Sequence, residues 1–444
     1  MAEASGPQKL SGIKVAMFTA IAMLLPFAVI GLLEIALRAG GYGRAQALFI
    51  PATFDSARFL MPNPRFAARY FPGDPSPPTP PSDAFLREKP PTAFRVFVLG
   101  ESTTAGFPFA SNGTFSRVLA DALGDVLSVP VEVVNVGIPA TNSFALYDQL
   151  PDVIAQRPDA VLIYAGHNEY YGALGAASTV RLAGNPGLVR TVLRLKRLRV
   201  VMLFQRAVDA ARPRSNAPPS GVSRMEELAG RDTLRLGGDG YRRGVEQLRG
   251  NLRAILRDLH DAGIPAYVAS LASNLRDQAP FASDSGTAAT NAGAAFAAAH
   301  VALAAGDPAA ESLFARARDL DLVRFRAPGE FNTVIRDVAA AESATYVPVA
   351  EAFRLAAESR IPGDDLFFEH VHPRPAGIVL IARAFFDALR ARRFHGRLPD
   401  VSLIEDWNPY AERMALTAVD SQVASTIVAA LKSRWPFVRR DSGL

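Results

Sequence analysis

The chain has 444 residues, of which 49% are hydrophobic and 20% charged, a composition typical of a globular protein with one large domain and additions. The net charge of +5 is modest for this length, and no zinc-finger, RNA-binding or basic-zipper pattern is present, so nucleic acid is not an expected partner. Cysteine is absent, which excludes disulfides, thiolate zinc sites and a cysteine nucleophile.

An uncharged apolar segment lies close to the start of the chain. Residues 15–33 read "VAMFTAIAMLLPFAVIGLL", which is long enough to cross a bilayer and longer than the apolar core of a typical cleaved signal peptide. We therefore predict a signal-anchor, with a tail at 1–14 and a transmembrane helix at 15–37. Two lysines precede the segment and two arginines follow it, so the flanking charges favour neither orientation, and only the short tail favours a cytoplasmic N-terminus.

The next segment, residues 38–92, is dense in proline. Its second half lies in "FPGDPSPPTPPSDAFLREKPPTAF" at 71–94, and such a composition is typical of an extended, semi-rigid chain. We predict a tether that holds the following domain away from the membrane.

From residue 94 onward, buried strands alternate with amphipathic helices. The predicted strands are "FRVFVL", "VEVVNV", "AVLIYAG", "PAYVASL" and the weaker "ATYVPV", and a helix at about 376–390 closes the series. This alternation predicts a parallel sheet with helices on both faces, over residues 93–395.

Two insertions interrupt the alternation, and an extension follows it. Residues 174–239 contain the basic stretch "RTVLRLKRLRVVMLFQR", which we interpret as a surface helix in preference to a membrane contact or a flap over the site. Residues 291–321 are alanine-rich and predict a single helical hairpin that turns at Gly306. Residues 396–444 are predicted to form a helical extension.

The stretch "FVLGESTTAG" places Ser102 directly after the first predicted strand of the sheet. No lysine follows its glycines, which excludes a phosphate-binding P-loop, and the glycine spacing does not fit a dinucleotide fingerprint. Ligands of open α/β sheets bind at the carboxyl ends of the strands. Ser102 is therefore a candidate nucleophile.

Three of the six histidines lie at the same predicted edge. His167 follows the third strand in "AGHNEYYG", and His370 and His372 precede the last helix in "FFEHVHPRPAG". The spacing of Glu369 and His372 lets the carboxylate reach one ring nitrogen while the other faces a nucleophile. Three alternative interpretations remain. Asp365 would be the acid in place of Glu369, or Glu369 would only cap the following helix. In the third, His370 and His372 would hold a metal ion, but the sequence offers few other metal ligands.

Oxyanion donors are available at the ends of the same strands. They are the N–H of Ser102, the N–H of Gly137 in "NVGIPATNS", and the side-chain amide of Asn168 in "GHNE". Serine, glycine, asparagine and histidine thus occur in that order along the chain.

These four ordered blocks resemble those of the SGNH/GDSL-type hydrolases. Glu101 replaces the common aspartate of "GDS", a change that we predict not to touch the chemistry, and Glu369 replaces the usual aspartate of the last block. The apolar segment with "LLEIALRAGGYG" after it, and the stretch "SNLRDQAPF", resemble the membrane-anchored bacterial branch of the family.

The resemblance implies a flavodoxin-like three-layer α/β/α domain and a membrane-anchored serine esterase. Ser102, His372 and Glu369 would form the triad, and Ser102, Gly137 and Asn168 the oxyanion hole, with no metal or organic cofactor. An acylated glycan or a lipid-like ester is the implied substrate, and a periplasmic face the implied location. An O-acyltransferase with the same residues, a non-catalytic cell-envelope scaffold or binding module, and a metal hydrolase are the alternatives.

Overall fold

The computed structural model describes residues 12–54, 57–72, 74–109, 111–179, 185–211, 224–229, 233–397 and 404–438. The chain divides into two units. One comprises Met1–Gln46 with Thr191–Arg214, and the other comprises Ala47–Arg190 with Ser215–Leu444. Part of the predicted tail, of the first insertion and of the C-terminal extension lies outside the described residues.

The smaller unit contains the predicted anchor. Helix α1 (Gly12–Ala39) is long and apolar enough to cross a membrane, and none of its residues is buried. The predicted basic helix is in fact two helices, α5 (Pro186–Lys196) and α6 (Arg199–Ala211). Within this unit, the Glu34 carboxylate of α1 accepts a hydrogen bond of 3.0 Å from the N–H of Val200, at the start of α6.

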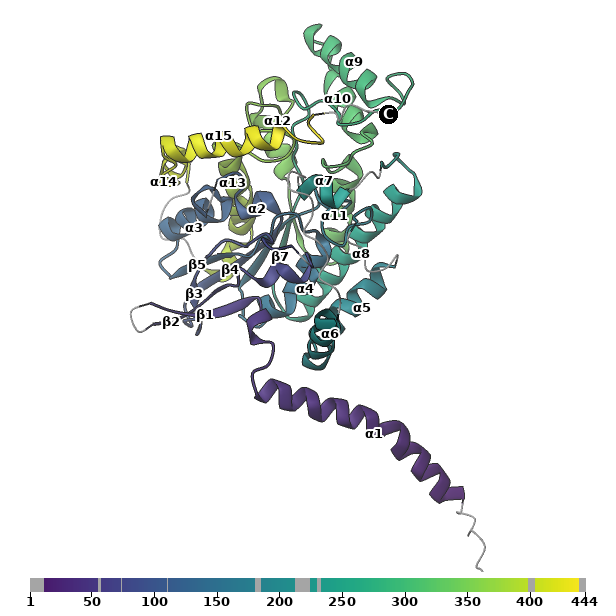
Figure 1. Cartoon of the computed structure of the whole chain (residues 1–444). Helices are drawn as coiled ribbons and strands as arrows, with labels where there is room; N and C mark the ends of the chain where they lie inside the picture. Colours follow the sequence, from purple (N-terminus) through teal and green to yellow (C-terminus); the bar gives the residue numbers. More distant parts are fainter. Residues whose placement is uncertain are drawn as a thin grey trace, which may run out of the picture. The chain divides into compact units, whose positions relative to one another are not determined.

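The larger unit is built on a parallel sheet of five strands, as predicted (Figure 1). Its order is β5-β4-β6-β7-β8. The strands are β4 (Phe94–Gly100), β5 (Val131–Asn135), β6 (Ala160–Tyr164), β7 (Ala266–Ala269) and β8 (Thr345–Val347). Strands β4, β6 and β7 are buried along their whole length, because helices cover both faces, and so they read as nearly continuous apolar runs.

Helices form the two outer layers of this three-layer domain. On one face α3 (Phe115–Val126) packs against α13 (Pro375–Ala391), which also contacts α12 (Val349–Ala356). On the other face α8 (Asp239–Asp261) lies between α4 (Ser143–Ile154) and α11 (Gly329–Ala341). The buried side chains of α8 recur every three or four residues, which is the spacing of a single helix face: Tyr241, Val245, Leu248, Leu252, Ile255, Leu256 and Leu259.

The predicted tether is structured over much of its length, which differs from the sequence expectation. It contains an antiparallel sheet of β1 (Phe49–Phe54), β2 (Ala57–Pro62) and β3 (Phe85–Leu86), and the turn η2 (Phe66–Arg69). The rings of Phe49 and Phe85 lie 5.6 and 5.4 Å from that of Phe97 in β4. This burial of aromatic rings against the main sheet outweighs the extended tendency of the prolines.

The alanine-rich insertion forms the predicted helical hairpin. Helices α9 (Ala292–Ala304) and α10 (Ala310–Leu320) pack along each other, and Gly306 between them has a left-handed φ of 68°. In the described part of the first insertion, residues 174–179, 185–211, 224–229 and 233–239, only helices occur as regular elements: α5, α6, α7 (Arg224–Ala229) and the start of α8.

The described part of the C-terminal extension contains α14 (Asn408–Arg413) and α15 (Ala418–Lys432). Tyr410 donates a hydrogen bond of 3.0 Å to Asp125 of α3, which ties the extension to the main domain. Beyond α15 the ring of Phe437 lies 5.5 Å from the ring of His370. The described segment after α15 thus reaches the loop that carries the predicted histidines.

Candidate active site

Ser102 lies on a tight turn between strand β4 and the short helix α2 (Ser102–Ala105). Only glycine fits at position 100, because an added Cβ would lie 1.9 Å from Thr104 Oγ1 and 2.4 Å from the carbonyl oxygen of Tyr164. Gly106 ends the turn with a φ of 92°, in the left-handed region that glycine favours. The turn holds Ser102, which is partly buried, at the carboxyl edge of the sheet.

The loop before α13 brings His372 to this serine. A β-bridge joins Phe367 to Pro373, and the N–H of Phe368 donates to the carbonyl oxygen of His372 at 2.9 Å, so the loop closes on itself. Nε2 of His372 lies 2.7 Å from Oγ of Ser102, and its Nδ1 contacts Oε1 of Glu369. The three predicted residues therefore lie in one chain of contacts.

The surroundings favour a neutral imidazole with a fixed orientation. Burial lowers the pKa of His372 from its usual value, and the Phe107 ring packs on the imidazole at 4.4 Å between centroids. A neutral imidazole can accept a proton at Nε2 when Nδ1 carries the hydrogen. The buried Glu369 carboxylate beside Nδ1 favours that tautomer and would stabilise the imidazolium that forms.

The alternatives in which Asp365 is the acid, or Glu369 caps helix α13, can be compared with the contacts of the two carboxylates. Asp365 accepts hydrogen bonds from Nη2 of Arg276 at 2.9 Å and from the N–H of Glu358 at 3.0 Å, which directs its carboxylate to other partners than His372. The N-cap of α13 is Arg374, with no side-chain cap bond. The oxygens of Glu369 instead accept from backbone N–H groups within its own loop, at 2.7 Å from His370 and 3.0 Å from His372.

Among the described residues, two of the three predicted oxyanion donors have an N–H group without a hydrogen-bond partner. Asn168 is half-exposed, and within the described part of the chain its side-chain amide makes no hydrogen bond; the same holds for the N–H of Ser102 at the start of α2. Both groups are polar donors at the edge where Ser102 presents its hydroxyl.

The prediction for Gly137 needs correction. Its N–H donates to Oδ1 of Asn135 at 2.9 Å, and the residue is buried beneath Thr104, so this donor is already used. Three residues later, the half-exposed Ala140 has a φ of 60°, and its N–H has no hydrogen-bond partner among the described residues. Sequence reasoning missed this position because it expected glycine where the backbone turns, and here alanine holds the left-handed conformation.

The other two histidines of the cluster are buried and neutral. Burial, followed by the nearby His372, lowers the pKa of His167 to about 3, and its Nδ1 accepts a hydrogen bond of 3.2 Å from the N–H of Ala327. Burial also lowers the pKa of His370, whose Nδ1 contacts the second oxygen of Glu369. Ligand atoms of Glu369, His370 and His372 lie within 4.8 Å of one another, so within the described part of the chain these three are close enough together to hold a metal ion.

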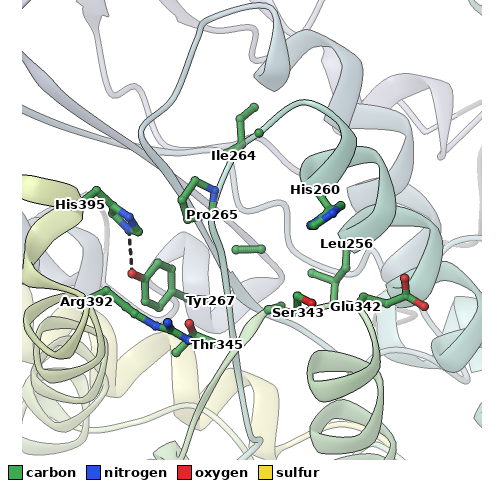
Figure 2. Close-up of a pocket in the computed structure, with 13 residues that line it drawn as sticks. Leu256, His260, Ile264, Pro265, Tyr267, Glu342, Ser343, Thr345, Arg392 and His395 are labelled. Carbon is green, nitrogen blue, oxygen red and sulfur yellow. Dashed lines mark hydrogen bonds between the residues drawn. The ribbon is translucent and has the colours of Figure 1, made fainter.

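A cavity of about 420 Å³ lies at the opposite edge of the sheet (Figure 2). Ile264 and Pro265, which precede β7, and Ser343 and Thr345, at the start of β8, line it. None of the predicted site residues lines this cavity. It is a separate feature from the edge that carries Ser102.

A family match decides which kind of protein has this fold. The sequence model of the GDSL-like Lipase/Acylhydrolase family matches residues 98–378, well over half of the chain. The chain belongs to this family. As a GDSL-like acylhydrolase it is a hydrolase that acts on ester bonds, and the match begins in β4 and extends into α13.

Solved structures of family enzymes resemble the chain at low identity. A lipase/acylhydrolase from Enterococcus faecalis is 16% identical, with a TM-score of 0.34, over 69% of this chain and 99% of that one. A variant acetyl xylan esterase from Geobacillus stearothermophilus is 15% identical, with a TM-score of 0.36, over 69% of this chain and 97% of that one. No curated protein matches the chain.

Proposed function

We propose that this GDSL-like acylhydrolase is a membrane-anchored serine esterase with a Ser102–His372–Glu369 triad. The observation that carries the proposal is the 2.7 Å contact between Nε2 of His372 and Oγ of Ser102, with Glu369 on the other ring nitrogen. This is the arrangement that nucleophilic catalysis by a serine requires, since the hydroxyl is a weak nucleophile until a base takes its proton.

The acylation step follows from this geometry. Oγ of Ser102 attacks the ester carbonyl carbon while its proton moves to Nε2 of His372. The carbonyl π electrons move to oxygen, and the oxyanion accepts hydrogen bonds from the N–H of Ser102, the amide of Asn168 and the N–H of Ala140, which takes the role predicted for Gly137. Collapse of this intermediate breaks the bond to the alcohol oxygen, which leaves with the proton from His372.

The second half of the reaction returns the enzyme to its starting state. Water gives a proton to Nε2 of His372 and attacks the acyl carbon. The intermediate then releases the carboxylic acid, and Oγ of Ser102 recovers the proton. Glu369 keeps its charge throughout and stabilises the imidazolium in both halves.

Hydrolysis of p-nitrophenyl acetate and of a long-chain p-nitrophenyl ester by the full-length protein in detergent tests the proposed activity. We expect release of p-nitrophenol to survive a metal chelator and to be lost after treatment with a serine-directed phosphonate. The phosphonate should add its mass to the peptide that contains Ser102. Loss of activity with the chelator, and its recovery on adding a divalent ion, would instead favour the metal hydrolase.

The proposed location rests on helix α1. Its apolar length suits a membrane anchor, and the resemblance to the membrane-anchored bacterial branch of the family supports a catalytic domain on the periplasmic side. An esterase held there would meet acylated glycans or lipid-like esters of the cell envelope, which we propose as the substrate class.

Added protease tests the orientation. In cells whose outer layer has been made permeable, we expect digestion of the domain after about residue 40, because that domain would face the added enzyme. A cytoplasmic marker protein should stay intact in the same cells, and lysis should expose both. Protection of the domain until lysis would reverse the proposed orientation, and release of the chain by alkaline washing would argue against an anchor.

A further inference from the structure

We propose that Glu101, next to the nucleophile in sequence, is a positioning residue that holds the Asn168 loop in its working conformation. This inference rests on the proposed function and extends it, because it assigns a role to a side chain that the sequence analysis left outside the chemistry. The role is carried by contacts between Glu101 and the backbone that follows β6.

The contacts are made by both oxygens of one buried carboxyl group. Oε1 of Glu101 accepts from the N–H of Gly166 at 3.0 Å, and Oε2 accepts from the N–H of Asn168 at 3.2 Å. The backbone N–H of His167, between them, lowers the pKa of the same carboxyl. Two N–H groups of the loop thus bond to a side chain that starts from the turn of Ser102.

The loop gains from such support because it contains a glycine with wide backbone freedom. Gly166 has a φ of 144°, and an added Cβ there would lie 2.7 Å from Cδ1 of Leu271. Glycine reaches this φ without strain but also reaches many others, so contacts from neighbouring groups must select the one conformation that the loop adopts. The hydrogen bonds to Glu101 fix this conformation and connect the loop to the turn of Ser102. One side chain thus sets the spacing between Ser102 and Asn168.

An amide in place of this carboxyl cannot make the same contacts. Each oxygen of Glu101 faces a backbone N–H, and glutamine has one oxygen and one NH₂ group, so one loop N–H would face another donor. This holds for either protonation state of Glu101, whose pKa is raised by burial and then by the charge of Glu169. We expect the loop to shift while the fold persists.

Glu169 is the matched control. It is equally buried and is adjacent to Asn168 in sequence, but its Oε1 accepts from Oγ of Ser143 and from Nε2 of Gln247, each at 2.6 Å, and its Oε2 accepts from the N–H of Ser143 at 3.2 Å. Glutamine would leave one of these donors facing an NH₂ group, so Glu169→Gln makes the same chemical change as Glu101→Gln at different partners. Its contacts join the loop to α4 and α8 and do not reach the N–H of Asn168.

A double-mutant cycle on the full-length protein tests the assignment, with p-nitrophenyl acetate as the substrate. Asn168→Ala should lower kcat by ~10²–10³-fold, as for an oxyanion donor. Glu101→Gln should lower kcat by at least ~10-fold and leave KM within about twofold, because the loop is displaced and substrate binding is not removed. The double variant should be within about twofold of Asn168→Ala, since Glu101 acts through Asn168.

Hydrogen exchange gives a second readout that does not depend on activity. The amides of the peptide covering 164–172 should exchange faster in Glu101→Gln than in the wild type, and Glu169→Gln should keep kcat within about threefold of the wild type. If Glu101→Gln fails to fold, Glu101→Asp takes its place in the cycle. Aspartate keeps two acceptors on a shorter arm, so its kcat should lie between those of the wild type and of Asn168→Ala.

Several outcomes overturn the inference. They are wild-type kcat in Glu101→Gln, unchanged exchange of the 164–172 peptide, an unchanged kcat in Asn168→Ala, or single-variant losses that multiply fully in the double variant. Failure of the proposed function is a separate result, because it would appear as turnover in Ser102→Ala. If Ser102→Ala is inactive and Glu101→Gln is fully active, only the role of Glu101 falls.

Discussion

Replacing Ser102 with alanine is expected to abolish ester hydrolysis while the protein stays folded. The loss of kcat should be on the order of 10⁴- to 10⁶-fold, because members of a triad act as a unit and removing the nucleophile removes the covalent route. Ser102 is only partly buried, and its described side-chain contact is with Nε2 of His372, so removal of the hydroxyl should shift Tm little. Steady-state kinetics with p-nitrophenyl acetate and a thermal melt measure both effects.

Ser312→Ala is the control for this experiment. Ser312 is an exposed serine on α10, bonded to the carbonyl oxygen of Ala309, and its loss should leave kcat unchanged. A serine-directed phosphonate should label the wild type and Ser312→Ala, and should not label Ser102→Ala. Near wild-type turnover in Ser102→Ala would contradict the proposed mechanism as a whole.

Glu369→Gln is expected to give the second largest effect, a fall in kcat of about 10⁴-fold with KM little changed. A neutral amide does not hold Nδ1–H of His372 in place, so the imidazole can take the wrong tautomer, and it does not stabilise the imidazolium. The variant should also be less stable, by about 1–3 kcal/mol, because the two oxygens of Glu369 accept from buried N–H groups and an amide can serve only one of them. Kinetics below the lowered Tm separate the two effects.

Asp365→Asn is the matched control, since it removes the charge of the other candidate acid. Asp365 bonds to Arg276 and to the N–H of Glu358, so its loss should lower Tm and leave kcat within about twofold. If the kinetic effects of the two variants were exchanged, the role of triad acid would pass to Asp365. If Glu369→Gln lost stability and kept its turnover, Glu369 would be a structural residue only.

The sequence by itself determined the architecture of the main domain, because periodicity and burial act locally. Runs such as Phe94–Gly100 are apolar on both faces of the strand. In the segments between them, apolar residues recur every three or four positions, as on one face of a helix. Together these patterns predict a parallel sheet covered by helices on both faces. The order of Ser102, Asn168 and His372 at strand and loop ends followed from the same pattern. The helical hairpin around Gly306 was also readable, since its turn residues are local signals.

Only the tertiary structure decided which side chains and backbone groups that are distant in sequence contact one another. Proline content predicted a tether, but Phe49 and Phe85 gain more by packing on Phe97 than an extended chain would gain in water. Gly137 had the right residue type, yet its N–H is taken by Asn135, while Ala140 turns the backbone. The contacts of Glu101 with the loop of Asn168 join positions more than sixty residues apart, and no local pattern encodes such a distance.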